Sequence, residues 1–259
     1  VTKEHIAIMA EKYGVSSNTY RIRVQGMPPL SDEDTLIPWD WIEDAKSREF
    51  KDEDGGLSEP LILGVDVGAG GDKSVIVSRR GGSILNIWRY NTKDTMELCG
   101  RLVECIESTE AKAVFIDTIG IGLGVYNRIC ELGYRGRVYS ADIRRSANMP
   151  DKFQRRRDEL WWQVREMFEI GTISIPDDTA LVDQLGAIKY KVDSSGKIKI
   201  ESKPEMKMRG MSSPDEADAL CLTYFRSSKI FSRVQGTEKA KGYGTKSFEQ
   251  YGDQGWMRA

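Results

Sequence analysis

The residues LILGVDVGAGGDKSVIV, from Leu61 to Val77, are the most informative stretch of the chain. They read as an apolar strand that contains a single carboxylate, Asp66, followed by a glycine-rich polar turn and a second apolar strand. A buried carboxylate is costly unless it is paired or binds a cation. We therefore expect Asp66 to be paired with another group or to bind a cation, unlike an ordinary surface acid.

Similar acids recur downstream. Asp117 ends the apolar run 113–116, and Asp215 and Asp218 are three residues apart on a helix-like run, so they share one face. Acids at strand ends and on one helix suggest a site for hard divalent cations. Simpler roles stay open: Asp66 and Asp117 could cap turns, and Asp215 could serve the helix dipole.

The periodicity predicts an α/β fold with a mixed sheet. Strands are expected at 61–67, 73–79 and 83–90 as an antiparallel meander, and later at 113–117 and 136–140. Helices are expected at 95–108, 120–132, 158–169 and 214–225, the last opened by a capping box of Ser213, Pro214 and Glu216. The runs 186–192 and 197–202 should form a hairpin. In this order Asp66 lies at the sheet centre and Asp117 beside it.

Three parts of the chain are expected. Residues 1–59, with short helices at 2–13 and around 39–42, read as an N-terminal linker segment, residues 60–226 as the main domain, and residues 227–259 as a polar, flexible C-terminal tail. The chain begins with Val1 rather than Met, and we expect it to be a piece of something longer.

Composition excludes several classes of protein. The chain has four cysteines without a CxxC pair and a single histidine, His5, so a zinc site is not expected and the cysteines should be reduced core residues of a cytosolic protein. No apolar run approaches the roughly 20 residues of a membrane span, and no signal peptide is visible.

The net charge of the chain is only −2, so any positively charged surface has to be local. Residues 135–157 and 186–210 are rich in Lys and Arg, which suggests phosphate-binding surfaces, although a solvated charged face would look the same. A two-residue spacing would put the hairpin lysines on one face. The DNA-binding candidates are Arg144, Arg145, Arg155, Arg156, Arg157, Lys189, Lys191, Lys197 and Lys199.

An ATPase of the actin and sugar-kinase class is an alternative, since Asp66 to Gly71 followed by Ser74 is similar to its first phosphate loop. No good second loop follows, and no GxxxxGK[ST] motif occurs, so we expect no ATP hydrolysis.

Three motifs and one connecting segment resemble another family more closely. They are Leu63–Gly68 with Gly71–Ser74, Val114–Asp117, Ser213–Leu220 and the segment Thr35–Pro38. Over residues 1–226 the chain resembles the nuclease domain of the large terminase subunit of tailed bacteriophages, within the RNase H-like and RuvC-like superfamily. A RuvC-type junction resolvase shares the acid set and is a second alternative.

The resemblance implies an RNase H-like mixed sheet flanked by helices, with an auxiliary β-hairpin. It implies a DNA endonuclease that cuts concatemeric double-stranded phage DNA during packaging. Asp66, Asp117, Asp215 and Asp218 would bind two Mg²⁺ or Mn²⁺ ions, one orienting hydroxide and the other stabilising the leaving 3′ oxygen.

The resemblance also suggests partners and a location. In the full motor these are the portal protein and the small terminase subunit, in the host cytoplasm, with an ATPase domain preceding this segment. The isolated domain should be monomeric. No basic residue adjoins the acids in sequence, so we expect their replacement by alanine to abolish cleavage while stability holds or rises, with Asp215→Ala the mildest.

Overall fold

A computed structural model of the 259-residue chain describes residues 6, 24, 34–50, 59–68 and 73–225. The helix expected at 2–13 and the tail at 227–259 lie outside the described residues, apart from Ile6. The described segments from 34 to 225 belong to one compact unit.

A five-stranded mixed sheet forms the centre of this unit. Its order is β3-β2-β1-β4-β5, with β1 (Leu61–Asp66), β2 (Ser74–Arg80), β3 (Ser83–Tyr90), β4 (Ala113–Asp117) and β5 (Val138–Ala141). β1 pairs with β2 antiparallel and with β4 parallel, while β4 pairs with β5 parallel. The predicted α/β meander and the central position of β1 are confirmed.

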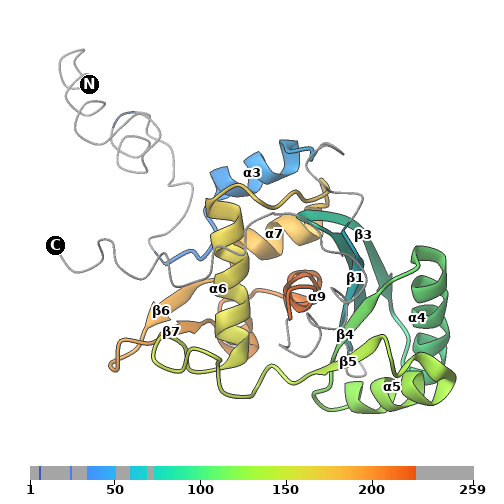
Figure 1. The fold of residues 1–259 in the computed structure, drawn as a ribbon. Coiled ribbons are helices and arrows are strands. Elements are labelled where there is room, and N and C mark those ends of the chain that lie inside the picture. The colour runs from blue at the N-terminus through green and yellow to red at the C-terminus, as the bar shows by residue number, and fades with distance from the viewer. Residues whose placement is uncertain (1–5, 7–23, 25–33, 51–58, 69–72, 226–259) are drawn as a thin grey trace. The chain divides into compact units, whose positions relative to one another are not determined.

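Helices cover both faces of the sheet (Figure 1). On one face lie α4 (Thr95–Thr109) and α5 (Gly122–Ile129), which continues into the π-helical turn η3 (Cys130–Tyr134). On the other lie α9 (Asp215–Leu222), α6 (Arg156–Glu169), α7 (Thr179–Ala187) and α3 (Trp39–Ser47). The core divides accordingly: Val75 and Val77 of β2 face the α9 side, and Ile76 faces α4.

Residues before the predicted domain boundary share this core. Leu36, Ile37, Ile42 and Ala45 are fully buried with α6, α7 and α9. Leu36 N–H also donates to the Ile188 carbonyl at 3.0 Å. The segment 34–47 therefore packs as part of the unit that carries the sheet.

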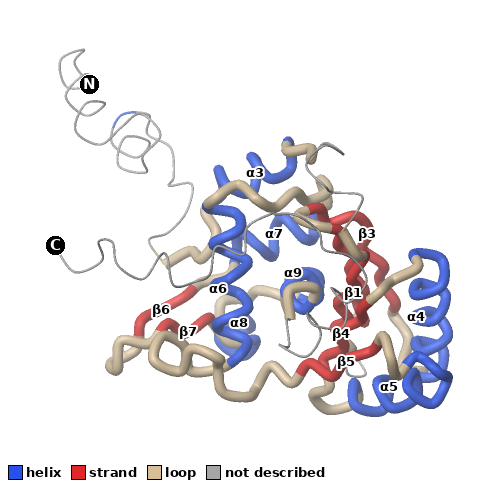
Figure 2. Tube along the Cα trace, in the orientation of Figure 1, coloured by secondary structure: helices blue, strands red, loops and turns tan. Residues whose placement is uncertain are grey.

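Two helices have no counterpart among the sequence predictions. α7 begins after Asp178, whose side chain accepts from Leu181 N–H at 3.0 Å. α8 (Lys203–Met208) begins with a capping box formed by Ser202 and Glu205. It follows the hairpin of β6 (Tyr190–Val192) and β7 (Ile198–Ile200), as Figure 2 shows.

The capping box expected at the start of the last helix is wrong. α9 has Pro214 at its N-cap, and no side chain caps it there. Ser213 Oγ instead donates to Asp215 Oδ1 at 2.5 Å. Glu216 is buried and accepts from Arg89, so a tertiary ion pair holds it rather than a local cap.

The four cysteines are free and buried, as expected of core residues. In the described part of the chain, no helix is long and apolar enough to cross a membrane.

Candidate active site

The strand order brings two of the predicted acids to one edge of the sheet. Asp66 ends β1 and Asp117 ends β4, its parallel neighbour. The carboxyl ends of parallel strands point the same way, so these two side chains share that edge. Asp66 is only 6 % exposed.

α9 brings the other two acids across β1. Gly64 permits this approach, because a Cβ at that position would lie 2.1 Å from the Ala219 carbonyl oxygen. Asp215 and Asp218 lie in the first turn of α9, and both are buried. The helix therefore rests on the strand that carries Asp66.

Arginines from the sheet hold both ends of α9. Near its start, Arg89 of β3 donates to Glu216 at 2.7 Å, and Gln184 of α7 also binds Glu216. At its end, Arg79 of β2 donates to the Thr223 carbonyl at 2.9 Å and to Thr223 Oγ1 at 3.1 Å. These charge-assisted contacts, buried at the end of the helix and partly buried at its start, fix the helix relative to the sheet.

Lys203, at the start of α8, joins three of the four acids. Its Nζ lies 3.4 Å from Asp66 Oδ2, 3.3 Å from Asp215 Oδ1 and 3.3 Å from Asp218 Oδ2. The acids therefore have a counter-charge, although no basic residue adjoins them in sequence. The sequence shows only neighbouring residues, whereas Lys203 reaches the acids through the tertiary fold.

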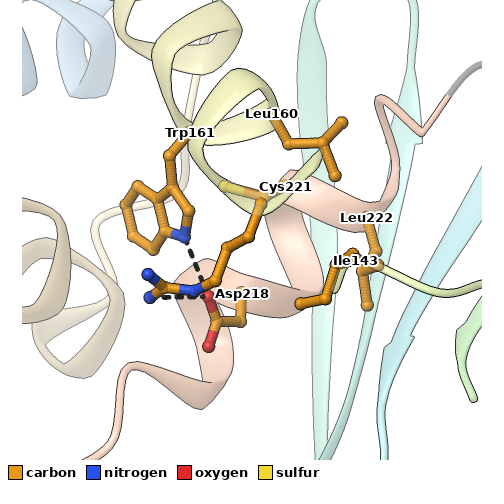
Figure 3. A pocket seen from close by; sticks show the side chains of 7 residues that line it. Ile143, Leu160, Trp161, Asp218, Cys221 and Leu222 are labelled. Atoms are coloured by element: carbon orange, nitrogen blue, oxygen red, sulfur yellow. Dashed lines mark hydrogen bonds and ion pairs between the residues drawn. The ribbon is translucent and has the colours of Figure 1, made fainter. Parts of the chain in front are cut away.

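Two further groups contact Asp218. Trp161 Nε1 of α6 donates to Asp218 Oδ1 at 2.9 Å, and Arg157 Nη2 lies 3.5 Å from the same oxygen (Figure 3). Burial alone would raise the pKa of Asp218. Arg157, Lys203 and the Trp161 hydrogen bond outweigh burial and lower that pKa below its ordinary value.

The pKa values of the two strand acids are shifted in the opposite direction, upward. Burial, together with the charges of Asp218, Asp215 and Asp117, raises the pKa of Asp66 to about 8, although Lys203 lowers it. Burial also raises the pKa of Asp117 to about 6, while the N–H of Ile119, which donates to Asp117 at 3.0 Å, opposes the shift. The mutual influence of Asp66, Asp117 and Asp218 shows that these three sites lie in one electrostatic cluster.

A divalent cation fits this set of donors. Three of the four carboxylates already surround one cationic group, the Lys203 ammonium, and oxygen ligands suit Mg²⁺ and Mn²⁺. In the described ranges, no three Asp, Glu, His or Cys side chains are arranged to share one ion. The Lys203 ammonium lies between three of the carboxylates.

The predicted DNA-binding arginines fall into two groups. Arg144 and Arg145 are 63 % and 79 % exposed and lie near Asp142, and Arg155 is also exposed. Arg156 is buried and pairs with Glu159 at 2.6 Å, which leaves little of it for a phosphate. Arg157 is largely buried beside Asp218, so the structure places it with the acids.

The hairpin lysines lie on one face, as their spacing predicted. Lys191 pairs across the strands with Lys199, and the backbone bonds from Asp193 to Lys197 and from Glu201 to Lys189 continue that register. Lys191 binds Glu205 of α8 at 2.8 Å, and Lys189 binds Asp34 at 2.9 Å. Nearby acids thus partly neutralise two of these four lysines.

Sequence reasoning missed several residues of the site. Lys203 and α8 had a local signal, since Ser202 to Glu205 reads Ser-Lys-Pro-Glu, a capping box with proline in the first turn. No local signal indicates a role in the site for Arg79, Arg89 or Trp161, because their partners are distant in sequence.

The fold is shared with known nucleases, although no family model and no curated protein sequence matches the chain. The nuclease domain of the large terminase subunit gp2 of bacterial virus Sf6 superposes with a TM-score of 0.60 at 19 % identity, covering 75 % of this chain and 100 % of that one. A variant of that domain with manganese gives 0.61 at 17 % identity, covering 74 % and 100 %. The large terminase nuclease from thermophilic phage G20c with bound magnesium gives 0.56 at 17 % identity, covering 74 % and 97 %. The chain therefore has the RNase H-like fold of the nuclease domains of phage large terminase subunits.

Proposed function

We propose that this chain is a metal-dependent DNA endonuclease of a viral packaging motor, which cuts concatemeric double-stranded DNA during genome packaging. The observation that carries the proposal is the convergence of Asp66, Asp117, Asp215 and Asp218 on the edge of the sheet, three of them around one ammonium group. The fold shared with terminase nuclease domains supports it.

The acids supply the ligands in this proposal. Asp66, Asp117, Asp215 and Asp218 would hold one or two Mg²⁺ or Mn²⁺ ions, which when bound activate water and stabilise charge on the scissile phosphate. Asp66 and Asp117 must first lose their protons, because burial raises both pKa values. Lys203 must release its three carboxylates, and its ammonium then becomes free to meet an anionic substrate.

DNA would approach along the exposed basic residues. Arg144, Arg145 and Arg155 lie on the segment between β5 and α6, and the hairpin adds one face of lysines. Contacts of this kind bind the backbone and position a duplex without reading its bases. In the full motor the segment would act with the portal protein and the small terminase subunit in the host cytoplasm.

The test is cleavage of supercoiled plasmid with Mn²⁺ or Mg²⁺ and without ATP. The wild-type chain should cut, and Asp66→Ala, Asp117→Ala and Asp218→Ala should each lose cleavage, whereas Asp215→Ala should be impaired less. Asp183→Ala removes an exposed acid of α7 and serves as the matched control. Wild-type cleavage by Asp66→Ala would show that Asp66 is not a ligand and would contradict the proposal.

Two further assays on the same protein distinguish the proposed function from its alternatives. ATP turnover that is lost in Asp66→Ala would favour the actin-like ATPase. Cleavage confined to four-way junctions, with linear and plasmid DNA left intact, would favour a junction resolvase.

A further inference from the structure

The indole of Trp161 has its hydrogen-bond acceptor on another helix. Trp161 is fully buried on α6, and a buried indole N–H requires a hydrogen-bond partner. The residue one turn later on its own helix is Arg165, which offers no side-chain acceptor. The N–H instead crosses to α9 and donates to Asp218 Oδ1 at 2.9 Å (Figure 3).

The adjacent residue, Trp162, has its hydrogen-bond acceptor within its own helix. Trp162 Nε1 donates to Glu166 Oε1 at 3.0 Å, within the same helix and four residues along. Two neighbouring tryptophans thus make the same kind of bond, but only that of Trp161 ends on an acid of the cluster.

Asp218 has two oxygens in different surroundings. Oδ1 receives Trp161 and lies 3.5 Å from Arg157, which is one turn earlier on α6. Oδ2 is buried and has no well-aligned hydrogen-bond donor in the described segments, and it faces the Lys203 ammonium at 3.3 Å. One oxygen is held by α6, and the other points into the acid cluster.

We propose that Trp161 is a positioning residue for metal binding: with Arg157 it holds Oδ1, so that Oδ2 is the atom of Asp218 that ligates the ion. The inference rests on the proposed function, because it needs a metal at the acid cluster. A carboxylate held through one oxygen loses less freedom when the other binds, and groups that orient a ligand in this way typically change metal affinity or activity by about 10–100-fold when they are replaced.

The experiment compares Trp161→Phe with Trp162→Phe. Both changes remove one indole N–H from the same helix, but only the first leaves Asp218 Oδ1 without this donor. Mn²⁺ binding is measured by titration calorimetry, and plasmid cleavage is measured against Mn²⁺ concentration. We expect Trp161→Phe to weaken Mn²⁺ binding about 10-fold or more. Its half-maximal Mn²⁺ concentration should rise in parallel, and Trp162→Phe should match the wild type.

A shape-matched replacement separates the hydrogen bond from packing. β-(3-Benzothienyl)alanine at position 161 keeps a two-ring side chain but carries sulfur in place of N–H. It should weaken Mn²⁺ binding as phenylalanine does. Normal Mn²⁺ affinity with this residue would show that any loss in Trp161→Phe came from packing, and would overturn the positioning role.

The inference and the proposed function fail differently. If the wild-type chain neither binds Mn²⁺ nor cuts DNA, the proposed function is contradicted, and the role of Trp161 falls with it. If the wild type binds and cuts while Trp161→Phe has unchanged Mn²⁺ affinity, only the positioning role is overturned.

Discussion

Replacing Lys203 by methionine removes the counter-charge of the acid cluster and keeps most of the side-chain stem. The side chains of Asp66 and Asp218 are 9 % and 5 % exposed, so the charge of Asp218, and that of Asp66 once it is ionised, would lose a partner inside the protein. Breaking a buried ion pair costs about 3–5 kcal/mol. Lys203 is itself 39 % exposed, and Arg157 stays beside Asp218, so we reduce the expected loss to about 2 kcal/mol. For a domain of this size that corresponds to a fall of about 4–8 °C in Tm.

The loss should depend on pH in a definite direction. The pKa of Asp66 in the folded protein is about 8, above its ordinary value, and Lys203 lowers it. Without Lys203 that pKa rises further. A group whose pKa is raised by folding favours the folded state while it is protonated and disfavours it as pH rises through the folded pKa. The variant should therefore lose more stability near pH 8 than near pH 6.

The assay is thermal unfolding in EDTA and then with Mn²⁺. A ligand that binds only the folded state raises its stability, by about 2.7 kcal/mol at one hundred times Kd. Mn²⁺ should stabilise Lys203→Met more than the wild type, because no ammonium has to leave the cluster. Lys207→Met, at an exposed position of the same helix, is the control. Equal melting temperatures for the two variants in EDTA would show that Lys203 does not stabilise the acid cluster.

Three further predictions follow from the same contacts. In EDTA near pH 8, Asp66→Asn should be at least as stable as the wild type, because it removes a carboxylate that burial disfavours. Asp218→Ala should lose about 1–3 kcal/mol of stability, because Arg157 and Trp161 lose their acceptor. Chemical denaturation measures both free energies of unfolding, and equal losses would contradict the assignment. Mn²⁺ affinity measured by calorimetry should rise from about pH 6 to pH 8, and binding should release protons, since Asp117 and Asp66 must ionise to bind the ion. An affinity that does not change with pH would show that neither acid titrates in this range. Replacing Lys189, Lys191, Lys197 and Lys199 by alanine should flatten the salt dependence of DNA binding by ~0.9 in log–log slope for each phosphate that the protein no longer neutralises, without changing Mn²⁺ affinity; an unchanged slope would leave the arginines between β5 and α6 as the remaining candidates.

The parts of the fold that were predictable are those with a strong local period. The three meander strands and the strand ending at Asp117 are short apolar runs bounded by turns, so they are found within one or two residues of their predicted ends. The pairing of β1 with β4 then follows from the helical crossover between them. That pairing explains why Asp66 and Asp117 share an edge.

The rest of the site depends on tertiary interactions that no local pattern records. Glu216 has the spacing from Ser213 that is typical of a capping residue, yet Arg89 lies 127 positions away and binds it instead. The helical period places Trp161 on the inward face, where it does lie, but its acceptor on α9 depends on how two helices pack. Lys203 reaches three acids because the chain turns back after the hairpin, and the acids' pKa values depend on that turn.

The most direct test of the central claim is the position of Mn²⁺ in a crystal of the wild-type chain, located by anomalous scattering. We predict an anomalous peak among Asp66, Asp117 and Asp218, with Asp218 Oδ2 as a ligand, Oδ1 still bound to Trp161 and Lys203 Nζ displaced. A peak only at other acids, with Lys203 still joined to all three carboxylates at saturating Mn²⁺, would contradict the account.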